Sequence, residues 1–188
     1  MSIENHADTV FVFIDAATSP QAGIAIGAFI CLNPQQINEL DQLSIASLSK
    51  QLASIVRYRK YTSNKSTWSE IKTAIHALNA IYEKRQGVGR IEIYTDCQNL
   101  CDLMGVRKEK LQKNNFMTKS GKIFQHAKLY KELYAIVENR HVHVFKVKGH
   151  HLSSQKITWY ERVFSVIDKL SRKKLRLVLK TRLIQKST

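Results

Sequence analysis

The chain has 188 residues, and a hydrophobic content of 44% with only seven glycines and two prolines excludes a disordered, collagen-like or low-complexity protein. A chain of this length can bury the core of one well-packed domain. Thirty Lys and Arg against fifteen Asp and Glu leave a formal charge of +15, which favours a polyanionic partner.

The first part of the chain predicts three strands. Apolar runs over 9–15 and 22–32 are separated by "AATSPQ", whose Ser-Pro pair suits a turn, so they predict an antiparallel hairpin. Residues 53–62 predict a third strand. The connection over 33–52 has apolar residues at mixed spacing, which leaves a short helix and a long connection both open.

A helix and a strand follow. From Trp68 to Tyr82 the apolar residues recur at helical spacing, and "RQGVG" supplies a glycine stop. The run "RIEIYT" predicts the fourth strand, and "DCQNLCDLM" predicts a short helix directly after it. Residues 105–122 are polar, basic and rich in turn formers, so we expect this segment to project from the body of the domain.

The remaining sequence predicts a helix over 123–138, a strand over 141–149, an exposed loop over 150–156 and a final helix from about Thr158. The full order is three strands, a helix, a strand, helices, a strand and a helix. This order predicts an α/β fold in which a mixed sheet carries helices on both faces.

The basic residues fall into two clusters. Residues 1–49 contain five acids and no Lys or Arg, and no acid follows Asp168. The clusters run from Arg107 to Lys131 and from Lys169 to Lys186. Solvated helix faces usually mix charges of both signs, so these clusters favour contact with nucleic acid.

Localisation is predicted from what the sequence lacks. The first residues do not have the pattern of a secretory signal, and no apolar run approaches the length that spans a bilayer. Three cysteines, Cys31, Cys97 and Cys101, have no paired metal-binding spacing. We expect a cytoplasmic protein that does not bind membranes, and we take it to be a monomer.

Four acidic residues stand at the edges of the predicted elements. Asp15 ends the first predicted strand, Glu70 opens the long helix, Asp96 ends the fourth strand, and Asp168 lies in the last helix. Each has a local explanation: Asp15 suits the start of a turn, and Asp96 can close its strand by bonding to the turning backbone. Glu70 can complete a capping box with Thr67, and Asp168 can be a surface residue. Sites in open α/β sheets assemble where strands end and helices begin, so we expect Asp15 and Asp96 to meet there.

Clustered carboxylates repel one another unless a cation lies between them, so the four acids predict a metal site. Ligands that are all oxygen favour Mg²⁺, with Mn²⁺ as the alternative. Two such ions can activate a water and stabilise the leaving oxygen during attack on a phosphodiester. The basic clusters are then placed to bind the phosphates of the substrate.

Successive landmarks of the sequence resemble the type 1 ribonuclease H family. They are "FIDAATSPQAGIAIGAFI", "STWSEIKTAIHAL", "IEIYTDCQNL", "LYKELYAIVENRHVHVFKVKGHH" and "VIDKLSRKKL". The resemblance implies a ribonuclease H-like fold, with a five-stranded mixed sheet whose first three strands are antiparallel. It implies one domain over 8–180, an insertion around 33–52, a basic protrusion around 105–122 and a basic tail over 181–188.

The resemblance implies a magnesium-dependent endonuclease, a hydrolase that cuts the RNA strand of an RNA–DNA hybrid. Matched by position, the metal-binding carboxylates are Asp15, Glu70, Asp96 and Asp168. His150 matches the loop histidine of the family, and His151 is nearly as good a match. The implied substrate-binding residues are Asn64, Gln98, Lys108, Lys110 and Lys113.

Glu161 is a rival for the fourth carboxylate, because the interval from His150 to Asp168 is longer than usual in the family. Asp168 is favoured because "IDKLSR" fits the closing pattern of the family better than "YERVF" does.

Two other functions stay open. One is a ribonuclease H-like binding module that is weak or inactive as a catalyst, which is favoured if the four acids are scattered in the fold. The other is a related nuclease acting on a different nucleic acid. Such nucleases usually have an Asp-x-Glu pair on the first strand, whereas Ala17 occupies the second position here.

Overall fold

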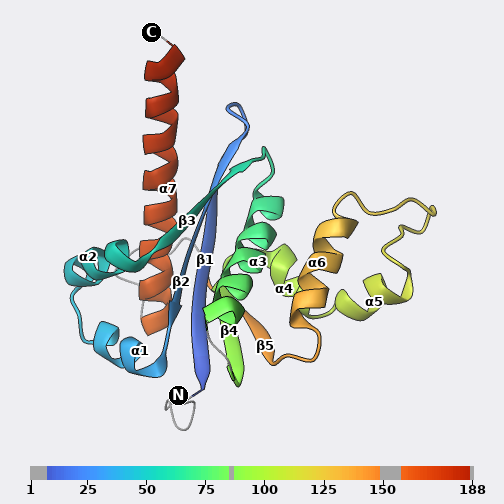
Figure 1. The fold of residues 1–188 in the computed structure, drawn as a ribbon, viewed down its shortest axis with the longest axis horizontal. Helices are drawn as coiled ribbons and strands as arrows, with labels where there is room; N and C mark the ends of the chain where they lie inside the picture. The colour runs from blue at the N-terminus through green and yellow to red at the C-terminus, as the bar shows by residue number, and fades with distance from the viewer. Residues whose placement is uncertain (1–7, 85–86, 149–157, 187–188) are drawn as a thin grey trace.

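The computed structural model describes residues 8–84, 87–148 and 158–186 (Figure 1). Its centre is a five-stranded sheet with the order β3-β2-β1-β4-β5. The strands are β1 (Thr9–Ser19), β2 (Ile24–Leu32), β3 (Arg57–Thr62), β4 (Arg90–Thr95) and β5 (Val142–Lys146). The first three pair antiparallel, while β4 runs parallel to β1 and β5 parallel to β4. The predicted mixed sheet with three antiparallel strands is therefore confirmed.

Helices cover both faces of the sheet (Figure 1). They are α1 (Pro34–Asp41), α2 (Ile45–Ile55), α3 (Ser66–Lys84), α4 (Gln98–Met104), α5 (Lys108–Lys113), α6 (Ala127–Val137) and α7 (Trp159–Lys186). One hydrophobic core joins the sheet to α3, α4 and α6, and a second joins it to α1, α2 and α7. Among the described residues, no helix is long and apolar enough to cross a bilayer.

The central strand β1 supplies side chains to both cores. Val12 and Ile14 belong to the core under α3, and Phe11 and Phe13 belong to the core under α7. Because successive side chains of a strand point to opposite faces, this alternation accounts for the unbroken apolar run in the sequence. The same alternation directs Asp15 toward α7.

The prediction that Asp15 ends the first strand is wrong. β1 continues to Ser19, with Asp15 opposite Ala28 and Ser19 opposite Ile24 of β2. The turn lies instead at 20–23, where Gly23 has a φ of +63° and donates its N–H to the Pro20 carbonyl at 3.2 Å. The antiparallel ladder provides backbone partners through the whole segment, which makes the extended form more favourable than an early turn.

The connection left open over 33–52 forms two helices, and the predicted third strand begins late. Residues 53–55 belong to α2, and β3 starts only at Arg57. Leu48 and Leu52, four residues apart on α2, are buried in the core shared with α7. Burial of this apolar face favours a helix over the extended conformation that the sequence predicts.

The basic segment over 105–122 carries α5 and lies to one side of the sheet, on the right in Figure 1. The final helix α7 begins close to the expected position and continues without a break through 181–186, the start of the predicted tail. The predicted loop over 150–156 lies outside the described residues. The limits of the domain, the insertion and the tail stay predictions.

Candidate functional site

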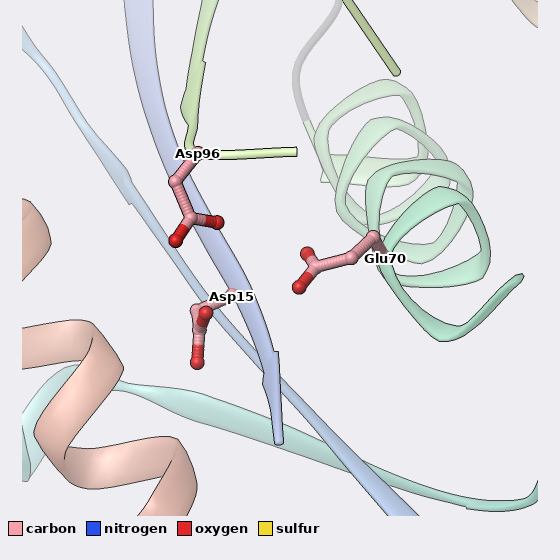
Figure 2. Close-up of side chains that lie close together, drawn as sticks. All are labelled: Asp15, Glu70 and Asp96. Atoms are coloured by element: carbon pink, nitrogen blue, oxygen red, sulfur yellow. The ribbon is translucent and has the colours of Figure 1, made fainter. Parts of the chain in front are cut away.

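Three carboxylates from three elements converge in the fold (Figure 2). Asp15 lies within β1, Glu70 is in the first turns of α3, and Asp96 directly follows β4. One oxygen of each lies within 4.8 Å of the others, and Figure 2 shows the side chains pointing into a common space. The fold therefore brings together residues that are 81 positions apart in the sequence, from 15 to 96.

The strand register explains why Asp15 and Asp96 meet. The parallel pairing of β1 with β4 ends with Phe13 opposite Tyr94, and two further residues along each strand are Asp15 and Asp96. The chain turns there because β4 stops at Thr95, whose hydroxyl accepts a hydrogen bond from the N–H of Cys97 at 3.1 Å. Asp96 is thus at the carboxyl end of a strand, beside a neighbour that continues.

Glu70 connects α3 to the central strand. Its Oε1 accepts a hydrogen bond from the backbone N–H of Ala16 at 3.0 Å. The capping-box explanation for Glu70 is wrong, because α3 begins at Ser66 and this carboxylate bonds to β1 rather than to its own helix start. The other oxygen of the Glu70 carboxylate, Oε2, is buried and has no hydrogen-bond partner within the described structure. An unpartnered buried oxygen is unfavourable unless it coordinates a cation.

The electrostatics of the cluster also favour a cation. Burial raises the pKa of Asp15 to about 6, although the hydroxyl of Ser171 donates to this carboxylate and lowers it. Burial, followed by the charges of Asp15 and Asp96, raises the pKa of Glu70 well above its ordinary value. Asp15 and Glu70 are therefore costly as bare carboxylates at neutral pH.

The donor set fits a hard divalent cation. It offers carboxylate oxygens alone, which suits Mg²⁺ or Mn²⁺ rather than a metal that prefers nitrogen or sulfur. A cavity of about 340 Å³ opens over the cluster. Its lining comprises Asp15, Ala16, Ala17, Ser66, Thr67, Glu70, Asp96, Cys97, Gln98, Asn99, Asp168 and Arg172. The cavity is wide enough to admit part of a substrate beside the cation.

Asp168 and Glu161 occupy different surroundings on α7. Asp168 lines the cavity, pairs with Arg172 at 2.7 Å, and through its charge adds to the rise in the pKa of Asp15. Glu161 accepts hydrogen bonds from the backbone N–H and the hydroxyl of Thr158 at 3.3 and 2.7 Å, at the start of the helix. The structure therefore brings Asp168, and not Glu161, to the cavity.

Of the other site residues expected from the sequence, Gln98 lines the cavity. Its side chain accepts from the Lys146 ammonium at 2.5 Å and donates to Asp102 at 2.7 Å, so the amide is held in one orientation. Asn64 is exposed in the bend before α3 and is not among the lining residues. His150 and its rival His151 lie outside the described residues.

The three predicted lysines lie on α5, away from the cavity lining. The Lys108 ammonium is 5.9 Å from the centre of the Tyr134 ring, Lys110 is exposed, and Lys113 pairs with Glu109 at 3.6 Å. Arg107 donates to the Asn99 side chain at 3.3 Å and so joins this segment to the rim of the cavity. The lysines are thus positioned to contact a ligand that extends past the cavity.

Sequence reasoning missed Asn99, Ser171 and Arg172. Ser171 and Arg172 follow Asp168 by three and four positions, which places them on the same face of a helix. Asn99 follows Gln98 on the short helix after Asp96. These spacings were readable in the sequence, but only once Asp168 and Asp96 were known to share a cavity.

Comparisons with known proteins identify the family and the fold. The model of the RNase H family matches residues 7–158, and a search of curated proteins finds no match. The foamy viral protease–reverse transcriptase bound to an RNA/DNA hybrid aligns with 92% of this chain and 20% of its own, at 12% identity and a TM-score of 0.61. The PFV RNase H domain aligns over 88% of this chain and 92% of its own, at 13% identity and a TM-score of 0.60. An N-terminal RNase H domain from Mycobacterium tuberculosis aligns over 93% and 98%, at 13% identity and a TM-score of 0.59. At these identities the likeness to solved structures concerns the fold.

Proposed function

The chain belongs to the RNase H family, and we propose that it is a metal-dependent endonuclease that hydrolyses the RNA strand of RNA–DNA hybrids. The observation that carries this proposal is the convergence of Asp15, Glu70 and Asp96 within 4.8 Å. Further support comes from the charge of +15 and from the hybrid bound by one structural neighbour. We take the protein to act in the cytoplasm as a monomer.

The carboxylates of Asp15, Glu70 and Asp96 would hold Mg²⁺ or Mn²⁺, with Asp168 as the fourth ligand. When bound, such ions supply Lewis acidity for activating a water and for neutralising charge on the leaving oxygen. The N–H of Ala16 fixes Glu70 so that the partnerless Oε2 is available to the site. Ser171 orients Asp15 through its hydroxyl.

Substrate contacts are assigned to residues around the cavity. Gln98, held by Lys146 and Asp102, suits a hydrogen bond across the wide minor groove, where 2′-hydroxyls distinguish RNA from DNA. Asn64 is proposed to assist there. The α5 lysines Lys108, Lys110 and Lys113 are proposed to bind phosphates, and His150 to aid proton transfer or product departure.

The test is incubation of the purified protein with labelled RNA–DNA hybrid, double-stranded RNA and duplex DNA, with Mg²⁺, Mn²⁺ or chelator. We expect cleavage of the RNA strand of the hybrid only, and only with metal. Asp96→Asn serves as the catalytic control and should be inactive under every condition. Cleavage that persists in both chelator and the Asp96→Asn variant rejects the mechanism, and tight binding without cleavage supports the inactive binding module instead.

Substitutions on α7 separate the two candidates for the fourth carboxylate. Asp168→Asn is expected to lower hybrid cleavage by about ten- to a hundredfold, because it removes a negative ligand from the cavity. Glu161→Gln should keep cleavage within about twofold and cost about 1 kcal/mol of unfolding free energy, since it weakens the hydrogen bonds to Thr158 at the helix start. Initial cleavage rates and urea unfolding measure both effects. If Glu161→Gln lowers cleavage and Asp168→Asn does not, Glu161 is the fourth carboxylate.

A further inference from the structure

One face of α7 carries an uninterrupted row of cations. Lys169, Lys173, Arg176 and Lys180, here called the α7 stripe, are spaced by four, three and four residues. This spacing aligns them along one side of a helix over roughly 16 Å. All four are exposed, whereas Leu175 on the same helix packs against the sheet.

The charge of the α7 stripe is uncompensated. None of its members makes an ion pair among the described residues, and no acid follows Asp168 in the sequence. Four like charges on one helix face repel, by a few tenths of a kcal/mol for each neighbouring pair. Such a face suits an anionic ligand that carries several regularly spaced charges.

The α7 stripe begins beside the candidate active site. Arg172, on the neighbouring part of the helix surface, lines the cavity and pairs with Asp168. From there the helix continues away from the cavity, and Figure 1 shows its last turns extending past the ends of β1, β2 and β3. The protrusion with α5 lies on the opposite side of the sheet in this view. The two basic regions are therefore separate surfaces: α7 reaches the cavity through Arg172, and the α5 segment reaches it through the hydrogen bond from Arg107 to Asn99.

We infer that the α7 stripe binds backbone phosphates of a nucleic-acid duplex that extends beyond the active site. It would be a second phosphate-binding surface in addition to the α5 lysines. The inference rests on the proposed function for the identity of the ligand. Phosphates follow one another at about 3.4 Å of axial rise per strand, so a stripe of this length spans about five nucleotides. A duplex lying in the cavity and along α7 thus meets cations at both places.

A phospholipid surface fits this face less well. Helices that lie on membranes bury an apolar face opposite the charged one. The apolar face of this helix is already covered, because its Leu175 packs against Ile24 and Ile26 of the sheet. Exposed apolar side chains on α7 occur at Leu177, within the length of the α7 stripe, and at Leu183 and Ile184 beyond its end. They are too few to form a continuous apolar face, whereas nucleic acid needs only the charged face.

The test compares two variants that each remove two positive charges. Arg176→Gln with Lys180→Gln alters the α7 stripe without touching the cavity lining, and Lys50→Gln with Lys84→Gln alters exposed lysines on α2 and α3. Binding of a fluorescent hybrid of about 25 base pairs is measured in chelator over a series of salt concentrations. The stripe variant should bind about tenfold more weakly, with the salt slope reduced by about two, while the control pair should stay within twofold of wild type.

Cleavage and lipid binding complete the experiment. With Mg²⁺, the stripe variant should raise KM and leave kcat unchanged. Its melting temperature should equal that of wild type or lie slightly above it, because both side chains are exposed and the substitutions relieve repulsion between like charges. Equal losses in the two variants, or no loss in the stripe variant, overturn the inference. So does a loss of binding to phosphatidylserine vesicles with hybrid binding intact, which assigns the face to membranes. Because binding is measured in chelator, a protein that binds hybrid but fails to cleave it refutes the proposed function alone.

Discussion

Asp15→Asn is expected to lower hybrid cleavage by at least about a thousandfold and at the same time to stabilise the metal-free protein. Asp15 shares a small space with Glu70 and Asp96, so the amide removes a charged ligand that the cation needs. Without metal the same charge is unfavourable, because burial raises the pKa of Asp15 from 3.8 to about 6. That shift corresponds to at most about 3 kcal/mol of unfolding free energy above pH 6.

Asp8→Asn is the matched control, because Asp8 is exposed and is not among the residues that line the cavity. Cleavage rates in Mg²⁺ and urea unfolding in chelator are measured for both variants at pH 7.5. The control should leave both quantities unchanged. A parallel loss of activity and stability in Asp15→Asn contradicts the prediction, since it means that this carboxylate stabilises the fold rather than straining it.

The metal-free protein is expected to lose stability as the pH rises from about 4 to above 6, and to regain it when Mg²⁺ is added. Both Asp15 and Glu70 have a pKa that is raised in the folded state, by burial first. Between the unfolded and folded pKa values the folded protein therefore binds more protons than the unfolded chain, so the unfolding free energy falls as pH increases. The penalty is absent below the unfolded pKa and fully present above the folded one.

We expect Mg²⁺ to reverse this loss, because the proposed site would bind it only in the folded state with the cluster deprotonated. At a concentration a hundred times its Kd it contributes about 2.7 kcal/mol. Thermal unfolding from pH 4 to 8, with chelator and with Mg²⁺, measures both effects. The difference between wild type and Asp15→Asn isolates the contribution of Asp15 from that of other carboxylates. A difference that is flat with pH in chelator contradicts the raised pKa of Asp15. A melting temperature unmoved by Mg²⁺ at pH 7.5 rejects the metal-site interpretation of the cluster.

Local sequence patterns predicted most of the order of the helices and strands. The alternation in "RIEIYT" and the helical spacing from Trp68 to Tyr82 identified β4 and α3, because side-chain period reflects which face of each element is buried. The spacing of apolar residues was least informative between 33 and 52, where it left a short helix and a long connection both open. There, two short amphipathic helices form because Leu48 and Leu52 pack into a core that includes residues of α7, more than a hundred positions away in the sequence.

For the candidate site, too, some features could be predicted from the sequence and others depended on the tertiary structure. The sequence alone determined that Asp96 follows the fourth strand, how the positive charge is distributed, and to which family the order of motifs is similar, since all of these are local or compositional. Only the tertiary structure decided that Asp15 lies within a strand, that Glu70 bonds to Ala16 rather than capping its own helix, and that Asp168 reaches the cavity while Glu161 stays at the helix start. The physical reason is that each of these outcomes depends on ladder pairing, burial or a hydrogen bond between distant segments. The free energy of such contacts exists only once the sheet and α7 have come together.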